Sequence, residues 1–178
     1  MVEPWLRGTL TEVDPFRRGV LHAFELAAED VAKWCGGLSA EELESQPCDI
    51  APVGFHLRHI ARSLDRLLTY ADGSALTEAQ LTKLGSEMVS RGREATLLEF
   101  AEGVEIAVAR VKRFGFDTYL EPRRVGRERL PTTVAGLLVH CAEHTQRHVG
   151  QAVTTAKVVV GIRQVDLLHP KGPWKTNS

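Results

Sequence analysis

The chain has 178 residues, of which 43% are hydrophobic and 25% are charged, and its formal net charge is −1. This composition is ordinary for a globular chain long enough to form one well-packed domain, and we expect neither nucleic acid nor a membrane as a partner. No apolar run approaches the roughly 18 residues of a membrane span, and the first residues lack the pattern of a secretion signal. Three cysteines without a CxxC pair predict reduced thiols in a cytoplasmic protein.

Two long amphipathic helices are predicted in the first half of the chain, each with hydrophobic residues at three- and four-residue spacing. The first begins at Asp14, an N-cap residue followed by proline. It ends at the Gly36-Gly37 pair, which can adopt a left-handed cap. The second begins near Pro52 and ends near Ala71.

Two short helices are predicted from capping boxes, in which Ser or Thr is followed three residues later by Glu or Gln. One starts at Ser39 and is closed by Pro47, and the other starts at Thr77 and ends near Gly85. We expect the polar segment 86–93 to be a loop.

A third long helix is predicted from Glu94 or Thr96 to Phe114, where Gly115 ends it. Its interior glycine, Gly103, weakens the helix by roughly 1 kcal/mol relative to alanine.

The segment 116–131 is rich in proline, glycine and arginine, which predicts an extended loop with a possible short hairpin at 118–130. A fourth long helix follows, capped by Thr132 or Thr133 and ending near Val158. We expect the arginines of the loop to be solvated; they are Arg123, Arg124, Arg127 and Arg129.

Four long amphipathic helices and two short ones predict an all-α fold, most simply a four-helix bundle. We expect a single domain over residues 1–178, with the bundle core at about 14–160. The remaining segment, 161–178, is predicted to be a non-helical tail whose last few residues are disordered.

The fourth helix carries three histidines at a spacing of four: His140, His144 and His148. Four residues advance about 40° around an α-helix, so the three imidazoles share a wedge roughly 80° wide. Apolar residues occupy the same wedge or its border, which predicts that the histidines face the core. Because ionisable rings on an apolar face cost free energy unless they are satisfied, this face is the main functional clue in the sequence.

Histidines four residues apart on a helix can bind one metal ion together, and a neighbouring helix of a bundle can supply a third ligand. The second long helix carries two candidates, His56 and His59. Three imidazoles leave coordination positions open, which is typical of catalytic rather than structural sites. The alternative is a set of core histidines satisfied by hydrogen bonds, and periodicity alone favours neither interpretation.

Two stretches of the sequence resemble the DinB/YfiT-like superfamily. The run HCAEHTQRHVGQ, from His140 to Gln151, is similar to its last-helix signature, and GFHLRHIARSLDRLLTY, from Gly54 to Tyr70, is similar to its second helix. The order of elements also fits up to about residue 160, including a long crossover connection between the second and third helices. The resemblance implies a four-helix bundle that holds a metal through three histidines.

Carried onto this sequence, the resemblance implies that the metal ligands are His59, His144 and His148. The helical wheel places His56 nearer the centre of the apolar stripe than His59, so His56 is the alternative ligand or a group that supports the ligands.

Two further residues lie near the predicted ligands, and the family pattern does not require the first of them, His140. We expect His140 to hydrogen-bond within the core or to line the pocket. Gln151 lies inside the histidine wedge and could orient a ligand or a bound water.

The better-understood proteins that the chain resembles are transferases and isomerases that use low-molecular-weight thiols. The resemblance therefore implies a zinc or nickel enzyme that acts on a small-molecule substrate with a thiol or water as nucleophile, and a homodimer. No acid or base beside the histidines stands out, so the catalytic residues are unknown. The alternative is a non-catalytic metal-binding or stress-response module of the same fold.

Two other features have ordinary interpretations. Arg58, Arg62 and Arg66 form a row on the polar side of the second helix, and we expect this row to be solvated or to face a partner. Cys141 is expected to be a small buried hydrophobe rather than a thiolate ligand.

Overall fold

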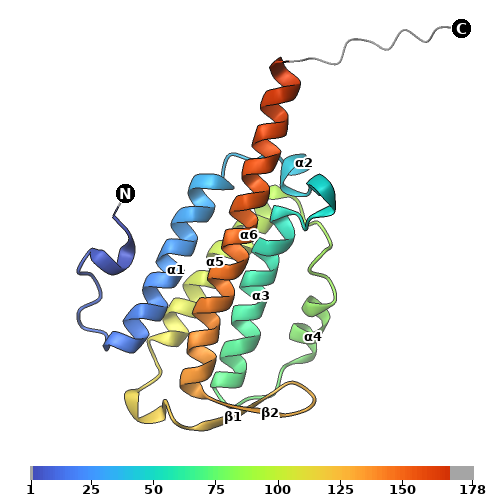
Figure 1. Ribbon diagram of the computed structural model, residues 1–178. Helices are drawn as coiled ribbons and strands as arrows, with labels where there is room; N and C mark the ends of the chain where they lie inside the picture. The colour runs from blue at the N-terminus through green and yellow to red at the C-terminus, as the bar shows by residue number, and fades with distance from the viewer. Residues whose placement is uncertain (1, 169–178) are drawn as a thin grey trace, which may run out of the picture.

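The computed structural model describes residues 2–168, and this part of the chain is mostly helical (Figure 1). The long helices are α1 (Pro15–Trp34), α3 (Val53–Ala71), α5 (Arg93–Val111) and α6 (Val134–Leu168), and the short ones are α2 (Ala40–Leu43) and α4 (Glu78–Leu84). The strands β1 (Pro122–Val125) and β2 (Leu130–Thr133) form an antiparallel hairpin. Single 3₁₀ turns span Pro4–Leu6, Pro47–Asp49 and Phe116–Thr118.

The all-α prediction is confirmed, and the four long helices pack around one core. In cyclic order they are α1, α6, α3 and α5, each contacting the next (Figure 1). Fully buried aliphatic and aromatic side chains fill the centre, each stabilising the fold by about 1.5–3 kcal/mol relative to an exposed position. They include Phe24 of α1, Leu57, Ile60, Leu64 and Leu68 of α3, Val111 of α5 and Leu138 of α6.

The connection from α3 to α5, which carries α4, runs back along α3 in the opposite direction (Figure 1). Gln80 of α4 donates to Asp65 in the second half of α3, and Arg58 near the start of α3 donates to the carbonyl of Glu87. The connection therefore returns the chain to the start of α3, and α5 points in the same direction as α3. This is the long crossover connection that the resemblance implies.

Helix starts agree closely with the sequence. Asp14 accepts hydrogen bonds from the backbone N–H groups of Phe16 and Arg17, and both capping boxes are formed, at Ser39 and at Thr77. These caps satisfy backbone donors that the first helical turn leaves free.

The predicted left-handed cap at the end of α1 is wrong. The residue that ends α1, Cys35, is right-handed, and neither Gly36 nor Gly37 has a positive φ. Gly36 is instead required by a close approach, because a Cβ there would lie 2.7 Å from the carbonyl oxygen of Ala32.

The predicted end of the fourth helix near Val158 is also wrong. Helix α6 continues through Gly161 to Leu168 and projects beyond the other helices (Figure 1). One glycine costs only about 1 kcal/mol in a helix, which is too little to end it. The rest of the predicted tail, residues 169–178, lies outside the described residues. Within residues 2–168, no helix has both the length and the apolar character that crossing a membrane requires.

Candidate metal centre

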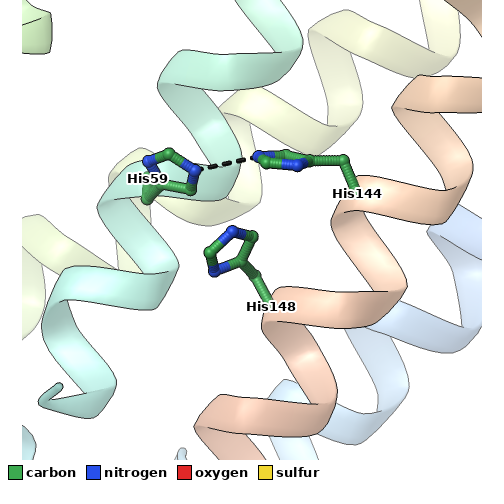
Figure 2. A group of neighbouring side chains, drawn as sticks. All are labelled: His59, His144 and His148. Atoms are coloured by element: carbon green, nitrogen blue, oxygen red, sulfur yellow. Dashed lines mark hydrogen bonds between the residues drawn. The ribbon is translucent and has the colours of Figure 1, made fainter. Parts of the chain in front are cut away.

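Three of the predicted site residues meet at the contact between α3 and α6. Figure 2 shows His59 of α3 pointing toward His144 and His148, which lie one turn apart on α6. The Nε2 atoms of His59 and His144 are 2.9 Å apart. The ring of His148 has its centroid 4.3 Å from that of His59 and 4.6 Å from that of His144. One nitrogen from each of the three residues lies within 4.8 Å of the other two, which is close enough to hold one metal ion.

The three rings lie at the edge of the helix contact and not in the core, which corrects, for His144 and His148, the prediction that the histidines of the fourth helix face the core. Each of the three histidines is partly exposed. The buried line of α6 is shifted by one position along the sequence and carries Cys141, Thr145 and Val149. The edge position leaves the imidazoles accessible, which a site for a substrate requires.

The donor set fits a divalent transition metal. Desolvation and the positive charge of neighbouring groups lower the pKa values of His144 and His148 to about 4, so both rings are neutral at pH 7. Neutral imidazole nitrogens are the form that binds zinc and nickel. The Nδ1 atom of His144 is buried and has no hydrogen-bond partner among the described residues. Two Nε2 atoms facing each other at 2.9 Å share at most one proton, so a cation between the rings would satisfy both lone pairs.

The alternative ligand, His56, lies beside this group. Its side chain is buried, and its Nδ1 is 3.0 Å from the Nδ1 of His148. Desolvation, followed by the charges of His148 and His59, lowers the pKa of His56 to about 4. The ring therefore contacts one of the converging histidines without belonging to the group of three.

Two residues beside His59 were missed by the sequence analysis. The ring of Phe55 stacks on that of His59 at a centroid distance of 5.4 Å. Glu87, in the segment predicted only as a polar loop, places its Oε2 atom 2.6 Å from the Nδ1 of His59. A carboxylate only accepts hydrogen bonds, so the Nδ1 of His59 carries the proton and its Nε2 lone pair faces His144.

Glu87 is buried yet ionised. Burial alone would raise the pKa of Glu87, but hydrogen bonds from His59 and Arg66 outweigh it and hold the pKa below its usual value. No local pattern in the sequence pointed to this residue; the only indication was an acidic side chain in a connection that returns along α3.

The arginine row of α3 is not solvated, and that prediction is wrong. The side chains of Arg58 and Arg62 are 0% and 3% exposed, because the connection between α3 and α5 covers this face of the helix. Arg58 pairs with Glu44 at 2.6 Å, Arg62 pairs with Glu99 at 2.7 Å, and Arg66 pairs with Glu87 at 2.8 Å.

A hollow of about 490 Å³ opens beside His56 along α6. Its lining includes the apolar Ile50 and the polar side chains of Arg147, Gln151 and Thr154. Gln151 is thus exposed on the wall of this hollow.

His140 and Cys141 do not join the centre. The side chain of His140 is 44% exposed and lies 3.7 Å from Glu143, which corrects the expectation of a hydrogen bond in the core. Cys141 is fully buried, and desolvation raises its pKa to about 12, so this thiol stays protonated as a small hydrophobe. The structure thus supports the expectation that Cys141 is no thiolate ligand.

Comparison with known families identifies the superfamily. The family model described as the DinB superfamily matches residues 23–152, which is more than half of the chain and includes all the histidines of the centre. A search of curated proteins found no match.

Proposed function

Because the chain belongs to the DinB superfamily, we propose that it is a divalent-metal-dependent enzyme with His59, His144 and His148 as its metal ligands. The convergence of three imidazoles at the edge of a helix contact carries this proposal. A hollow large enough for a small molecule is lined by His56, which contacts the ligand His148, and this supports a substrate site.

The proposed reaction is transfer, isomerisation or hydrolysis on a small-molecule substrate. Bound zinc or nickel would supply a Lewis acid that lowers the pKa of a thiol or water nucleophile. The chain's own residues bind and orient the substrate. Phe55 covers one face of the His59 ring, and Arg147 and Gln151 offer hydrogen bonds to a substrate in the hollow. A low-molecular-weight thiol as co-substrate and zinc or nickel as the metal remain part of the proposal, as does a homodimer.

A second function is favoured by one observation. His56 lies 3.0 Å from His148 and could act as a fourth ligand. Four protein ligands would close the coordination sphere, which is typical of a structural metal site. The protein would then be a non-catalytic metal-binding module.

Metal content of protein purified without a histidine tag tests the centre. We expect about one equivalent of zinc or nickel in the wild type. His59→Ala, His144→Ala and His148→Ala should each lose it. His140→Ala is the matched control, because this histidine lies one turn before His144 on the same helix but outside the group. A wild type that takes up neither added zinc nor added nickel would refute the proposal.

Cobalt substitution separates the two functions. In an open centre, added azide or a small thiol should change the visible spectrum of the cobalt protein, and His56→Ala should leave that response unchanged. In a closed centre, the wild type should not respond, and only His56→Ala should. A responding wild type would justify a screen for thiol transfer.

A further inference from the structure

The end of α4 and the segment that follows it are bound to α3 at several points. Arg62 donates to the carbonyl of Lys83 at 3.0 Å and to the hydroxyl of Ser86 at 3.2 Å. One turn earlier on α3, the Nε of Arg58 donates to the carbonyl of Glu87 at 2.9 Å. Both arginine side chains are buried, so these bonds are shielded from competing water.

Each of these arginines is also fixed by a carboxylate through two hydrogen bonds. Arg58 donates to both oxygens of Glu44 at 2.6 and 3.0 Å, and Arg62 donates to both oxygens of Glu99 at 2.7 and 3.1 Å. Two-point pairing sets the direction as well as the distance of a guanidinium. The backbone around Glu87 is thus held by guanidinium groups whose orientation is fixed.

The side chain of Glu87 is fixed in the same manner. Its Oε1 accepts from Arg66 at 2.8 Å, and its Oε2 accepts from the Nδ1 of His59 at 2.6 Å. Arg66 also donates to the hydroxyl of Ser63 at 3.0 Å, which holds the guanidinium over the same turn of α3. Both carboxylate oxygens are occupied, so Glu87 acts on the centre through His59 and is not itself one of the converging ligands.

We propose that Glu87 is a positioning residue: it accepts the Nδ1 proton of His59, and so fixes the tautomer and the ring rotation that present Nε2 to the metal. The buried arginines of α3 hold Glu87 in place. This inference rests on the proposed three-histidine metal centre. A histidine ligand commonly donates its second ring nitrogen to such a carboxylate, which raises its strength as a ligand.

Glu87→Gln tests the inference, because an amide has only one oxygen to accept from two donors. Either Arg66 or His59 loses its acceptor, and an amide N–H₂ turned to His59 favours the tautomer with its proton on Nε2. The matched control is Glu29→Gln, which makes the same change in a carboxylate of α1 that Arg7 holds at both oxygens, outside the histidine group and the arginine row. Circular dichroism and urea unfolding would show whether the two variants fold comparably.

The first readout is the affinity for zinc, measured by competition with a chelating dye. Glu87→Gln should bind zinc roughly 10–100-fold more weakly than the wild type. Glu29→Gln should stay close to the wild type. Glu87→Asp is a second variant: it keeps the charge and both oxygens but is one methylene shorter, so it should lose less affinity than Glu87→Gln. An affinity in Glu87→Gln equal to that in Glu29→Gln would overturn the inference.

The second readout needs no metal. Nitrogen-15 NMR of the metal-free protein should show His59 with its proton on Nδ1 in the wild type and in Glu29→Gln, and with the Nε2-protonated form populated in Glu87→Gln. An unchanged His59 tautomer in Glu87→Gln would sink the positioning role. If the wild type binds neither zinc nor nickel, the metal centre and its positioning both fail; if it binds zinc and Glu87→Gln binds equally well, only the positioning fails.

Discussion

Asp14 joins parts of the chain that are far apart in sequence. It caps α1 through the backbone of Phe16 and Arg17, and it accepts the hydroxyl of Tyr119 at 2.9 Å, a residue 105 positions later. Asp14→Ala should lower the free energy of unfolding by about 1–2 kcal/mol, measured by urea titration. Glu12→Ala, an exposed change two residues earlier, is the control and should have little effect.

The contribution of Asp14 should depend on pH with a defined sign. Burial would raise its pKa, but hydrogen bonds from Arg17 and Tyr119 outweigh this and lower it from 3.8. A depressed carboxylate pKa stabilises the fold above the unfolded value, and the effect is lost as the pH falls through the native value. The difference between wild type and Asp14→Ala should therefore be constant above pH 5 and should shrink below 3.8. A difference that grows on acidification would contradict this role.

The histidines predict a second pH effect, in protein stripped of metal. Desolvation and neighbouring charge lower the pKa values of His56, His144 and His148 from 6.5 to about 4. The unfolded chain then binds more protons than the native state between these values, so stability falls as the pH drops from 6.5 to 4. Thermal melts across this range should show the slope, and His148→Gln should reduce it. His140→Gln, outside the group, should keep it.

The histidines of the candidate centre could be found from spacing and resemblance, but their supporting residues could not. A helical wheel predicts which side chains are buried, so it favoured His56 over His59 as the ligand. His59 instead lies at the edge where α3 meets α6. Glu87 reaches His59 across 28 positions through the fold of a connection. A contact between residues so far apart leaves no periodic pattern in the sequence.

At the scale of helices, α5 and α3 approach each other closely at Gly103. A Cβ on Gly103 would lie 2.7 Å from the Cβ of Ala61 and 2.9 Å from its Cα. Gly103→Ala gains about 1 kcal/mol of helix propensity, but the clash with backbone should outweigh it and leave a net loss of about 1–2 kcal/mol. Gly19→Ala on α1 is the control, because a Cβ there meets no atom within 4 Å. Urea unfolding should show Gly19→Ala more stable than the wild type and Gly103→Ala less stable. If both substitutions stabilise the protein, α3 and α5 can move apart without cost to make room for the added Cβ.

The sequence predicted where the helices begin more reliably than it predicted which of their faces are buried. Capping residues and apolar spacing predicted the starts of α1, α2, α3 and α4, because these signals are local. The arginine row of α3 was predicted to be solvated because it lies opposite the apolar stripe, and only the returning connection shows that this second face is buried. The length of α6 was underestimated because the segment from Gly161 was predicted to be non-helical, although one glycine weakens a helix without ending it.

At the scale of the whole molecule, a metal bound by His59, His144 and His148 would join two of the four long helices. A ligand that binds only the folded state stabilises it by about 2.7 kcal/mol at a free concentration 100 times its Kd. Chelation should therefore lower the melting temperature of the metal-loaded protein, and added zinc should restore it. His148→Ala should melt at the same temperature with and without chelator; a chelator effect in this variant would place the stabilising metal elsewhere.

The two ligands on α6 and the one on α3 come into position at different stages of folding. His144 and His148 become neighbours as soon as one helical turn forms, whereas His59 lies 85 positions from His144 and arrives only when α3 and α6 dock. An incompletely folded chain thus offers a weak two-nitrogen site, and the docked chain offers a stronger three-nitrogen one. The rise in metal affinity during refolding would therefore report when α3 and α6 dock.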